Sequence, residues 1–562
     1  MGFHHRTGVL IRALQWHGRG TRQGAWIPFR VGGNPMNVWL RRTNACAALA
    51  LLGLALGGCS ALRTDFVKRP SHALPPTTST PSARYVHAAA DQHPQQSGFR
   101  LMTDGTNALM SRVALIDEAK HAVDLQYYIF KNDATGRLVA QHLLAAADRG
   151  VRVRLLIDDI NVSHEVGMLD ALNASPNFKV RLFNPFHTRK PSLLSKTVQL
   201  LFSPSRLNHR MHNKSFIVDN NVAIVGGRNI GDDYFSVDRT TDFRDLDLIA
   251  IGPVVKEASR AFDEYWNCPA AYPVTAFRGK RANHYDLAQL RANLGRDARH
   301  FAQTDYAQAA AQDYPDGPSG DRHGAWFWGP ARLVADQPAK IEPHQDNPAL
   351  RIGPQIRAMT DQAQHELLLV SPYFVPSKQD VRYLVGLVAR GVTVKVLTNS
   401  LASTDEPAVH AGYSRHRRAL LEGGVQLWEL RPAVGAPQPA TAKGTSSGVS
   451  LHAKAIVVDR QQTFIGSMNM DQRSKLLNTE MGIIVDSPAL AAAVKQFFDN
   501  ATRPANAYRV ILVARGLPHA GRMRWLASDD GKPVSYDGDP GVSMMRRLEV
   551  WMLRLLPIEG ML

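Results

Sequence analysis

The chain has 562 residues, of which 44% are hydrophobic and 20% charged. This ordinary globular composition sets aside the low-complexity and disordered classes, and the length suffices for two or three domains. The net charge of +17 at pH 7 favours anionic partners, either nucleic acid or an anionic membrane surface, without choosing between them. Residues 1–58 hold seven arginines and no acidic residue, so removing them would leave +10.

The N-terminal segment, 1–58, has the layout of a secretory leader. Arg41 and Arg42 precede ACAALALLGLALGG, an apolar run that is shorter than the roughly 20 residues needed to span a bilayer. The run ends in LGGC, which resembles a bacterial lipobox and implies a lipidated Cys59. An ordinary anchor or a cleaved signal is the alternative.

Ser60 follows the lipobox cysteine, and this favours an outer-membrane lipoprotein on the periplasmic side of a Gram-negative bacterium. Met36 lies five residues before the basic pair, so we interpret residues 1–35 as a mis-assigned start. With Cys46 in the leader and Cys59 lipidated, only Cys268 would remain as a thiol, and the mature chain would have no internal disulfide.

Residues 59–98 are rich in Pro, Ser, Thr and Ala and show no apolar period, which predicts a flexible tether. Beyond them, helical and strand patterns alternate, which predicts an α/β fold. The expected helices are 111–122, 136–150, 356–365 and 380–391, and the expected strands are 123–130, 151–159, 366–375 and 392–400.

The second set of elements repeats the first. Arg149 corresponds to Arg390 at an offset of 241 residues, and His121 to His365 at 244. A near-constant offset across several elements indicates two copies of one domain rather than a solenoid repeat. We place the domains at 99–275 and 346–510.

Between the domains, 276–345 is predicted to be a helical and looped connector with Trp326 and Trp328. The C-terminal extension, 511–562, ends in an amphipathic helix with arginines, leucines and Trp551. Such a helix suits a membrane interface, and docking on the protein's own core is the equal alternative.

One pattern occurs in both domains. His212 and Lys214 precede an apolar strand, a polar turn at Asp219 and a second strand that ends in Gly-Gly and then Asn229. The second copy has the same spacing and consists of His452, Lys454, Asp459, Gly466-Ser467 and Asn469. Residues two apart on a strand share a face, so each copy offers an imidazole, an ammonium and an amide on one patch.

This set of groups suits phosphoryl chemistry. An imidazole acts as nucleophile or general acid/base near neutral pH, while lysine and asparagine can hold phosphate oxygens. Two facing sets would place one histidine on each side of a phosphorus, as in-line displacement requires. The lysines would supply the positive charge, so we expect no metal and no other cofactor.

The doubled H-x-K-x4-D-x6-G-[GS]-x-N motif resembles that of the phospholipase D superfamily, and both copies match it fully. RLNHRMHNKSFIVDNNVAIVGGRNIGDDYF, TNSLASTDEPAVHAGYSRHRRALLEGGVQLWEL and LLPIEGML resemble bacterial cardiolipin synthases of the C type. The resemblance covers about residues 95–562. It implies two duplicated α/β/α sandwich domains with mixed sheets packed around a pseudo-two-fold axis.

The resemblance also implies roles. His212 would form a phosphohistidine while His452 acts as acid and then base. Lys214, Lys454, Asn229 and Asn469 would bind phosphate, and Asp219 and Asp459 would hold the turns.

Each histidine also needs a carboxylate to fix its tautomer. Glu480 lies 28 residues after His452 in the second half, and aligning the strands brings Asp245 opposite it in the first half, with Asp247 as the competitor. Ser467 and Ser474 are further candidates for the pocket lining.

The segment 187–210 mixes basic and apolar residues, so it could meet anionic lipid head groups or form a solvated loop. Its basic residues are Arg189, Lys190, Lys196, Arg206 and Arg210.

The expected reaction is phosphatidyl transfer that makes cardiolipin from phosphatidylglycerol and a second phospholipid. A phospholipase D-type hydrolase releasing phosphatidic acid shares the intermediate and is the alternative. A periplasmic nuclease fits the charge but not an exported, membrane-tethered location, and a catalytically dead binding protein conflicts with two intact motifs. Donor, acceptor, protein partner and oligomeric state stay open.

Overall fold

The computed structural model describes residues 66–164, 166–186, 204–238, 241–277, 286–313, 326–342, 347–432, 448–514, 516 and 518–555. The described residues form one compact unit by their contacts. The predicted leader, with Met36, Cys46 and Cys59, lies outside the described residues. Cys268 is described and is a buried free thiol.

The first half of the described chain is built on a nine-stranded mixed sheet. In sheet order its strands are β10 (Phe327–Gly329), β1 (Ser97–Met102), β8 (Asp247–Ile251), β6 (Val222–Gly226), β5 (Ser215–Val218), β2 (Ala122–Tyr127), β3 (Arg152–Asp158), β4 (Phe178–Phe183) and β9 (Ala271–Pro273). The β2–β3–β4 pairs are parallel and the others are antiparallel.

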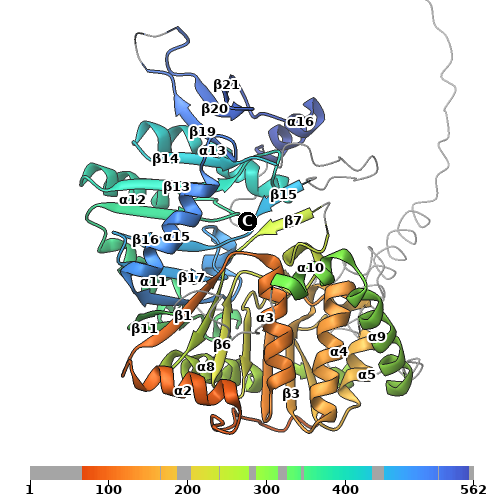
Figure 1. Cartoon of the computed structure of the whole chain (residues 1–562). Helices are drawn as coiled ribbons and strands as arrows, with labels where there is room; N and C mark the ends of the chain where they lie inside the picture. Colours follow the sequence, from red (N-terminus) through yellow and green to blue (C-terminus); the bar gives the residue numbers. More distant parts are fainter. Residues whose placement is uncertain are drawn as a thin grey trace, which may run out of the picture. The chain divides into compact units, whose positions relative to one another are not determined.

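The second half repeats this plan in a ten-stranded sheet. Its order is β11 (Ala331–Ala335), β18 (Met481–Asp486), β17 (Gln462–Gly466), β16 (Ala455–Val458), β12 (Glu366–Val370), β13 (Thr393–Asn399), β14 (Gln426–Leu430), β19 (Ala507–Leu512), β20 (Met523–Asp529) and β21 (Lys532–Tyr536). Again β12–β13–β14 are parallel. The matching order confirms the predicted duplication, and the two copies appear one above the other in Figure 1.

Helices cover both faces of each sheet in the described residues. The long helices are α2 (Pro81–Asp91), α3 (Gly105–Glu118), α4 (Ala134–Asp148), α5 (Val166–Asn173), α8 (Pro253–Asn267), α9 (Leu287–Ala302), α10 (Asp305–Asp313), α11 (Gly353–Asp361), α12 (Lys378–Ala389), α13 (Pro407–Glu422), α15 (Pro488–Ala501) and α16 (Met544–Leu553). Short turns are α7 (Pro204–Leu207), α14 (Gln472–Leu476), η1 (Asp159–His164), η2 (Asp232–Tyr234), η3 (Val274–Phe277), η6 (Pro338–Ile341) and η7 (Pro348–Leu350).

The strand side chains alternate between two cores, as a sheet covered on both faces requires. In the second half, Leu367 and Leu369 pack toward α11 and α12 in an outer core. Leu368 and Val370 face inward, and share a core with α15 and with Leu248 of the first half. The two halves therefore have one continuous apolar core between them, and α3, α4 and α9 lie side by side on the outer face of the first (Figure 1).

A small parallel ladder also joins the halves. β7 (Thr241–Arg244) pairs with β15 (Gly448–Leu451), with Arg244 opposite Leu451. Each strand comes just before a residue of the predicted site, Asp245 in one half and His452 in the other. The ladder therefore fixes these two residues relative to each other.

The structure differs from the predicted flexible tether over its described part, residues 66–98. Ser71 O accepts a hydrogen bond from Arg154 Nη1 at 2.7 Å, and Thr77 O accepts one from Asn221 Nδ2 at 2.8 Å. Helix α2 follows, and β1 enters the first sheet at Ser97. The low apolar content was misleading because this run is held by its backbone groups, which pair with polar side chains of the domain.

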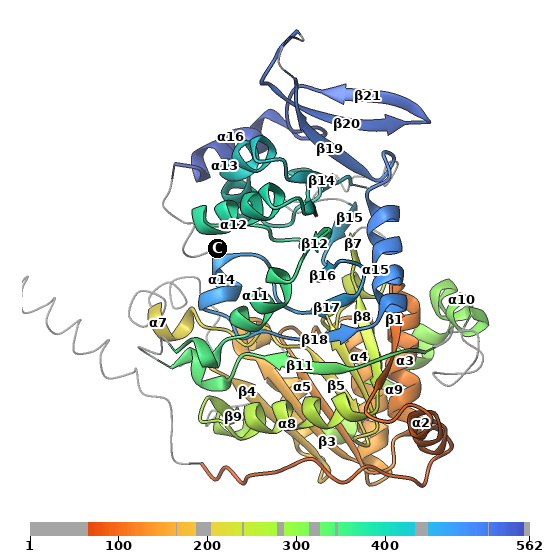
Figure 2. The ribbon, with the colours of Figure 1, turned by 90° about the vertical axis from the view of Figure 1, so that its left-hand side faces the viewer.

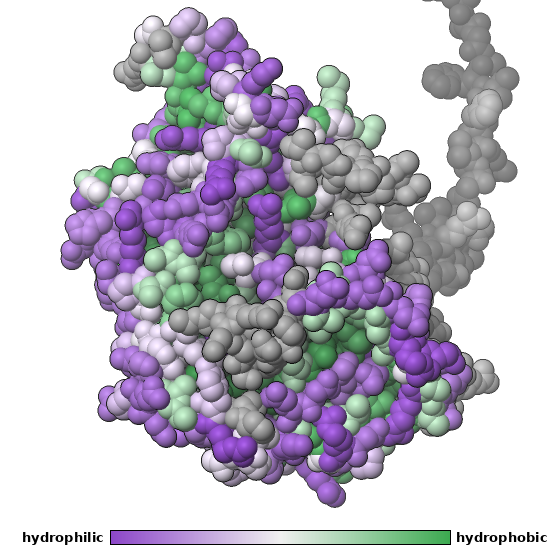
Figure 3. Space-filling view, in the orientation of Figure 1, coloured by the Kyte–Doolittle hydropathy of each residue, from purple (hydrophilic) through white to green (hydrophobic). Residues whose placement is uncertain are grey.

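The connector and the extension also contain more structure than predicted. The connector supplies an edge strand to each sheet, β10 to the first and β11 to the second. Beyond residue 510, β20 and β21 form a hairpin that extends the second sheet past α13 and α16 (Figure 2). Hydrophilic residues cover most of the face in Figure 3, and hydrophobic residues show in separate patches.

Candidate active site

The two motif aspartates sit in matching hairpin turns. Asp219 closes β5–β6 with φ of 50°, and Asp459 closes β16–β17 with φ of 49°; the next residue is also left-handed in each turn. Two such residues are typical of a type I′ turn, in which Asp is favoured. The Asp219 carboxylate accepts hydrogen bonds from three backbone N–H groups at the start of β2, at 2.7–3.0 Å. The Asp459 carboxylate accepts three at the start of β12, at 2.7–2.8 Å. Both side chains thus tie a hairpin to the neighbouring strand.

Each motif histidine is held by a carboxylate from the opposite half. His212 Nδ1 lies 2.8 Å from Glu480 Oε2, and the His212 backbone N donates to Thr479 O at 2.9 Å. His452 Nδ1 lies 2.5 Å from Asp245 Oδ2, and its backbone N donates to Arg244 O at 2.8 Å. The sequence places Glu480 in the half of His452 and Asp245 in the half of His212, so the structure crosses these pairs.

The buried Glu480 carboxylate accepts hydrogen bonds from two serines besides its contact with His212. Ser467 Oγ donates to it at 2.5 Å and Ser474 Oγ at 2.8 Å, so these serines contact the carboxylate. The Glu480 backbone N donates to Asp336 Oδ2 at 2.7 Å. The Asp336 carboxylate also pairs with Lys340 Nζ at 2.8 Å. Sequence reasoning missed Asp336, which lies in the connector outside either motif copy.

The first half uses a shorter carboxylate and needs a glycine beside it. A Cβ at Gly227 would lie 2.1 Å from Asp245 Oδ1, so a side chain there would displace the carboxylate. The competing residue, Asp247, instead pairs with Arg112 at 2.8 Å and contacts no motif histidine in the described structure. Asp245 is therefore the partner of His452.

Both lysines are buried beside the histidines. Lys214 Nζ donates to His212 O at 2.7 Å, and Lys454 Nζ donates to His452 O. Burial disfavours the ammonium and lowers the pKa of Lys214 to about 7 and that of Lys454 to about 8. The Lys454 charge also lowers the pKa of Lys214, which shows that the two motif copies face one electrostatic environment.

Burial also keeps the histidines neutral. It lowers the pKa of His212 to about 4 and that of His452 to about 3, against the opposing pull of their carboxylates. Despite their own burial, Glu480 and Asp245 have lowered pKa values because of the adjacent histidines and lysines. At pH 7 each imidazole therefore donates its Nδ1–H to a carboxylate, and its Nε2 carries a lone pair.

The motif asparagines differ between the halves. Asn229 Nδ2 donates to Tyr234 OH at 2.8 Å, and its Oδ1 accepts from Ile129 N at 3.1 Å. Asn469 Oδ1 is buried and has no hydrogen-bond partner among the described residues. The Tyr234 ring stands edge-on to His452 at 5.1 Å, a contact that sequence reasoning did not predict.

The basic segment is resolved into two parts. Arg210 is fully buried and pairs with Asp158 at 3.2 Å, and Arg206 Nη1 donates to Asn184 Oδ1 at 2.6 Å. Arg210 therefore belongs to the interior and is not a surface cation, and the Asp158 carboxylate compensates its buried positive charge. Residues 187–203, with Arg189, Lys190 and Lys196, lie outside the described residues.

Within the described ranges, no group of three or more His, Cys, Asp or Glu side chains is arranged to hold a metal ion. The site consists of two neutral imidazoles, two buried ammonium groups and two buried carboxylates. It can bind an anionic diester and offers two Nε2 atoms for nucleophilic attack and proton transfer.

Comparisons with known proteins agree with this geometry. The family described as "Cardiolipin synthase, PLD-like domain" matches residues 113–266 and 356–502, which contain one motif copy each. The chain is 37% identical over 487 residues to "Cardiolipin synthase C" of Escherichia coli (strain K12), covering 85% of this chain and 99% of that protein. It is 32% identical over 501 residues to an uncharacterized protein of Helicobacter pylori (strain J99), covering 87% and 94%.

A solved structure shares the fold. The phosphatidylserine synthase of Haemophilus influenzae Rd KW20 superposes with a TM-score of 0.53 at 12% identity, covering 84% of this chain and 99% of that chain. The duplicated sheets, the doubled motif and the extent of the matches lead to one conclusion. The chain belongs to the phospholipase D superfamily, among the cardiolipin synthase-like enzymes.

Proposed function

We propose that the protein makes cardiolipin from phosphatidylglycerol and a second phospholipid, through a phosphohistidine at His212. The chain is a phospholipid phosphatidyltransferase by its family, since cardiolipin synthases match it along most of its length. The observation that best supports this proposal is the crossed pairing. Glu480 holds His212 and Asp245 holds His452, so that two neutral imidazoles lie in one site.

In the first step, His212 Nε2 attacks the phosphorus of one phospholipid. A P–N bond forms, the P–O bond to the head-group alcohol breaks, and the alcohol oxygen takes a proton from His452. In the empty site, burial lowers the pKa of His452. The negative charge of a bound phosphodiester would raise this pKa and so stabilise the protonated His452 that donates the proton. Glu480 stabilises the positive charge that develops on His212.

In the second step, His452 accepts the proton of a phosphatidylglycerol hydroxyl. The hydroxyl oxygen attacks phosphorus, the P–N bond breaks and His212 returns to its neutral form. The products are cardiolipin and the released head-group alcohol. Lys214, Lys454, Asn229 and Asn469 hold the non-bridging oxygens, so the charge balance needs no metal.

A liposome assay tests this function. Phosphatidylglycerol vesicles, with and without phosphatidylethanolamine, are incubated with the purified protein in EDTA, and lipids are read by mass spectrometry. We expect cardiolipin with the native chain and none with His212→Ala. Phosphatidic acid alone would indicate hydrolysis, and no lipid product would contradict the proposal and direct attention to nucleic acid.

We also propose membrane attachment by two means, a lipid on Cys59 at the periplasmic face of the outer membrane and helix α16. Supporting the second, Met544, Met545 and Trp551 of α16 are 87%, 81% and 56% exposed, while Val550 packs under the helix. The Arg547 side chain turns toward the protein and donates to Asp539 O at 2.8 Å. The apolar side chains thus point outward, as expected for a helix lying in an interface.

No helix in the described part of the chain combines the length and apolarity required to cross a bilayer. Cys59 is tested separately, because Cys59→Ser would release the protein from the outer-membrane fraction if lipidation anchors it. Retention of this variant with an unmodified N-terminus would contradict the lipid anchor.

A further inference from the structure

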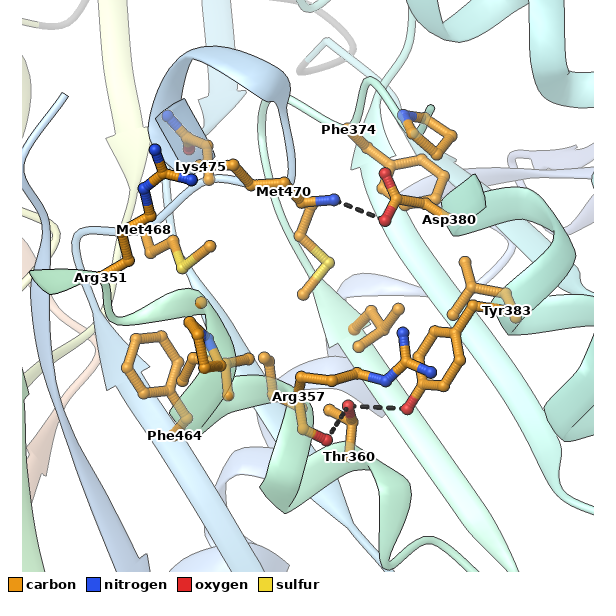
Figure 4. A pocket seen from close by; sticks show the side chains of 18 of the residues that line it. Arg351, Arg357, Thr360, Phe374, Asp380, Tyr383, Phe464, Met468, Met470 and Lys475 are labelled. Atoms are coloured by element: carbon orange, nitrogen blue, oxygen red, sulfur yellow. Dashed lines mark hydrogen bonds and ion pairs between the residues drawn. The ribbon is translucent and has the colours of Figure 1, made fainter. Parts of the chain in front are cut away.

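The second half contains an apolar cavity beside its copy of the motif. The cavity has a volume of about 510 Å³ and lies between the outer face of the sheet and helices α11 and α12 (Figure 4). Leu367, Leu369 and Ile456 line it from the strands, and Ile356 and Leu384 from the helices. Its size falls within the range of about 300–1,000 Å³ found for ligand pockets.

Charged groups stand where the cavity meets water. Arg357 is half exposed and stacks on Tyr383 at 3.4 Å from the ring centroid. Lys475 reaches across to Asp380, with Nζ and Oδ1 2.5 Å apart, and Arg351 lines the same side as Lys475 (Figure 4). Arg357 also pairs with Asp361 at 2.8 Å, so three cations and two carboxylates leave this rim with one excess positive charge over an apolar interior.

The cavity reaches the motif. Met468 and Met470 line it on either side of the motif residue Asn469, which also lines it. Thioether chains adapt to irregular apolar ligands. The buried Oδ1 of Asn469 has no partner in the described residues, whereas Asn229 Oδ1 in the first half accepts from a backbone N–H. An occupant of the cavity would therefore continue into the phosphate site.

In the first half, a buried polar network fills the corresponding space. Arg112 bonds Asp247 at 2.8 Å and Tyr127 OH at 3.2 Å, and Arg228 lies 3.4 Å from the same Asp247 carboxylate. Arg228 also donates to the carbonyls of Met102 and Thr103. These large polar side chains thus occupy the position that corresponds to the cavity.

The strand registers identify the replacements in the second half. Gly226 lies opposite Asp247, and Gly466 lies opposite Gly482, so Gly482 takes the place of Asp247. Aligning the two motif copies places Met468 at the position of Arg228. The offset of 244 residues between His121 and His365 places Ile356 at the position of Arg112. Every charged member of the network is thus exchanged for an apolar residue or glycine, and α11 has 9 residues where α3 has 14.

We propose that this cavity binds one acyl chain of the phospholipid substrate while its phosphate lies at the histidines, an inference that rests on the proposed function. A phospholipid combines an apolar chain with an anionic head, which matches an apolar interior under a cationic rim. The residues that line the cavity differ between the two halves, so it would distinguish one lipid-binding direction from the other.

Photocrosslinking tests the cavity independently of turnover. The full chain is irradiated with a phosphatidylglycerol analogue that carries a diazirine at the end of one acyl chain, and adducts are mapped by peptide mass spectrometry. We expect adducts on α11, α12 and residues 456–476. Ile356→Trp, which fills the cavity, should abolish them, and Ala358→Trp, on the exposed face of the same helix, should retain them.

Kinetics provide the second arm. Each buried methylene contributes roughly fourfold in affinity, so excluding two or three would lower kcat/KM for long-chain phosphatidylglycerol by about 15- to 60-fold in Ile356→Trp. A dihexanoyl substrate should lose far less. Adducts at the cavity without any cardiolipin would retain the lipid site and reject the proposed function. Adducts confined to α16 or spread over the surface would overturn the cavity proposal, whatever the activity.

Discussion

Glu480→Gln and Asp245→Asn should impair different steps, because the carboxylate pairs are crossed. Glu480 Oε2 is 2.8 Å from His212 Nδ1 and fully buried, so the amide would keep a hydrogen bond but lose the charge that balances a phosphorylated imidazole. Unit charges about 4 Å apart interact by about 4 kcal/mol at an effective dielectric of about 20. Loss of most of this interaction corresponds to about a 10²- to 10³-fold lower rate of phosphohistidine formation.

Asp245 would act through His452, so Asp245→Asn should impair protonation of the leaving alcohol. A phosphatidyl-p-nitrophenol substrate separates the two effects, since its phenolate leaves without a proton. We expect Asp245→Asn to release nitrophenol in the first turnover at close to the native rate, and Glu480→Gln to stay slow. Stopped-flow absorbance measures this burst. Ser474→Ala removes one hydrogen bond to Glu480, so it should raise the activation free energy of the burst by only about 1 kcal/mol and serves as the control.

The reverse result would refute the assignment of His212 as the nucleophile. If Asp245→Asn slowed the nitrophenol burst while Glu480→Gln left it unchanged, the nucleophile would be the histidine paired with Asp245.

Four further outcomes are expected. First, kcat/KM should fall as pH rises above about 7 to 8, because buried Lys214 and Lys454 have pKa values of about 7 and about 8 and lose the charge that holds phosphate; a rate that is flat to pH 10 would contradict this role. Second, Asp247→Asn should lower the free energy of unfolding, measured by denaturant titration, by about 3–5 kcal/mol, because it leaves the buried Arg112 charge uncompensated. A native-like unfolding midpoint would argue that the network does not stabilise the fold. Third, Asp459→Ala should lower stability by about 2 kcal/mol with little change in KM, because it removes three backbone hydrogen bonds at a turn; a large rise in KM with native stability would instead place it at the substrate. Fourth, Trp551→Glu should weaken sedimentation with anionic vesicles several-fold without affecting turnover of a soluble short-chain lipid; unchanged binding would exclude α16 as a membrane contact.

The duplicated fold was predictable from the sequence, because apolar periodicity and motif spacing are local properties that both halves share. The doubled motif also gave the groups of the site, and the structure brings His212, Lys214, His452 and Lys454 together. The carboxylate pairs could be named but not matched, since a sequence does not show which edge of one half faces the other. The β7–β15 ladder places Asp245 beside His452.

Other features depend on contacts that leave no periodic signal. Residues 66–98 look like a linker by composition, yet the domain's polar side chains capture their backbone. Asp336 lies in a segment without a motif, and its importance comes from one hydrogen bond to Glu480 N. The cavity was invisible because it arises from replacements between copies, such as Met468 for Arg228, that become meaningful only in three dimensions.

Intact and peptide mass spectrometry of His452→Ala, after mixing with phosphatidyl-p-nitrophenol, tests the central claim most directly. This variant has the nucleophile but lacks the base for the second step, so a phosphatidyl adduct should accumulate on the peptide that contains His212. The same treatment of His212→Ala should give no adduct. An adduct on the His452 peptide of His212→Ala, together with none on His212 in His452→Ala, would contradict the account.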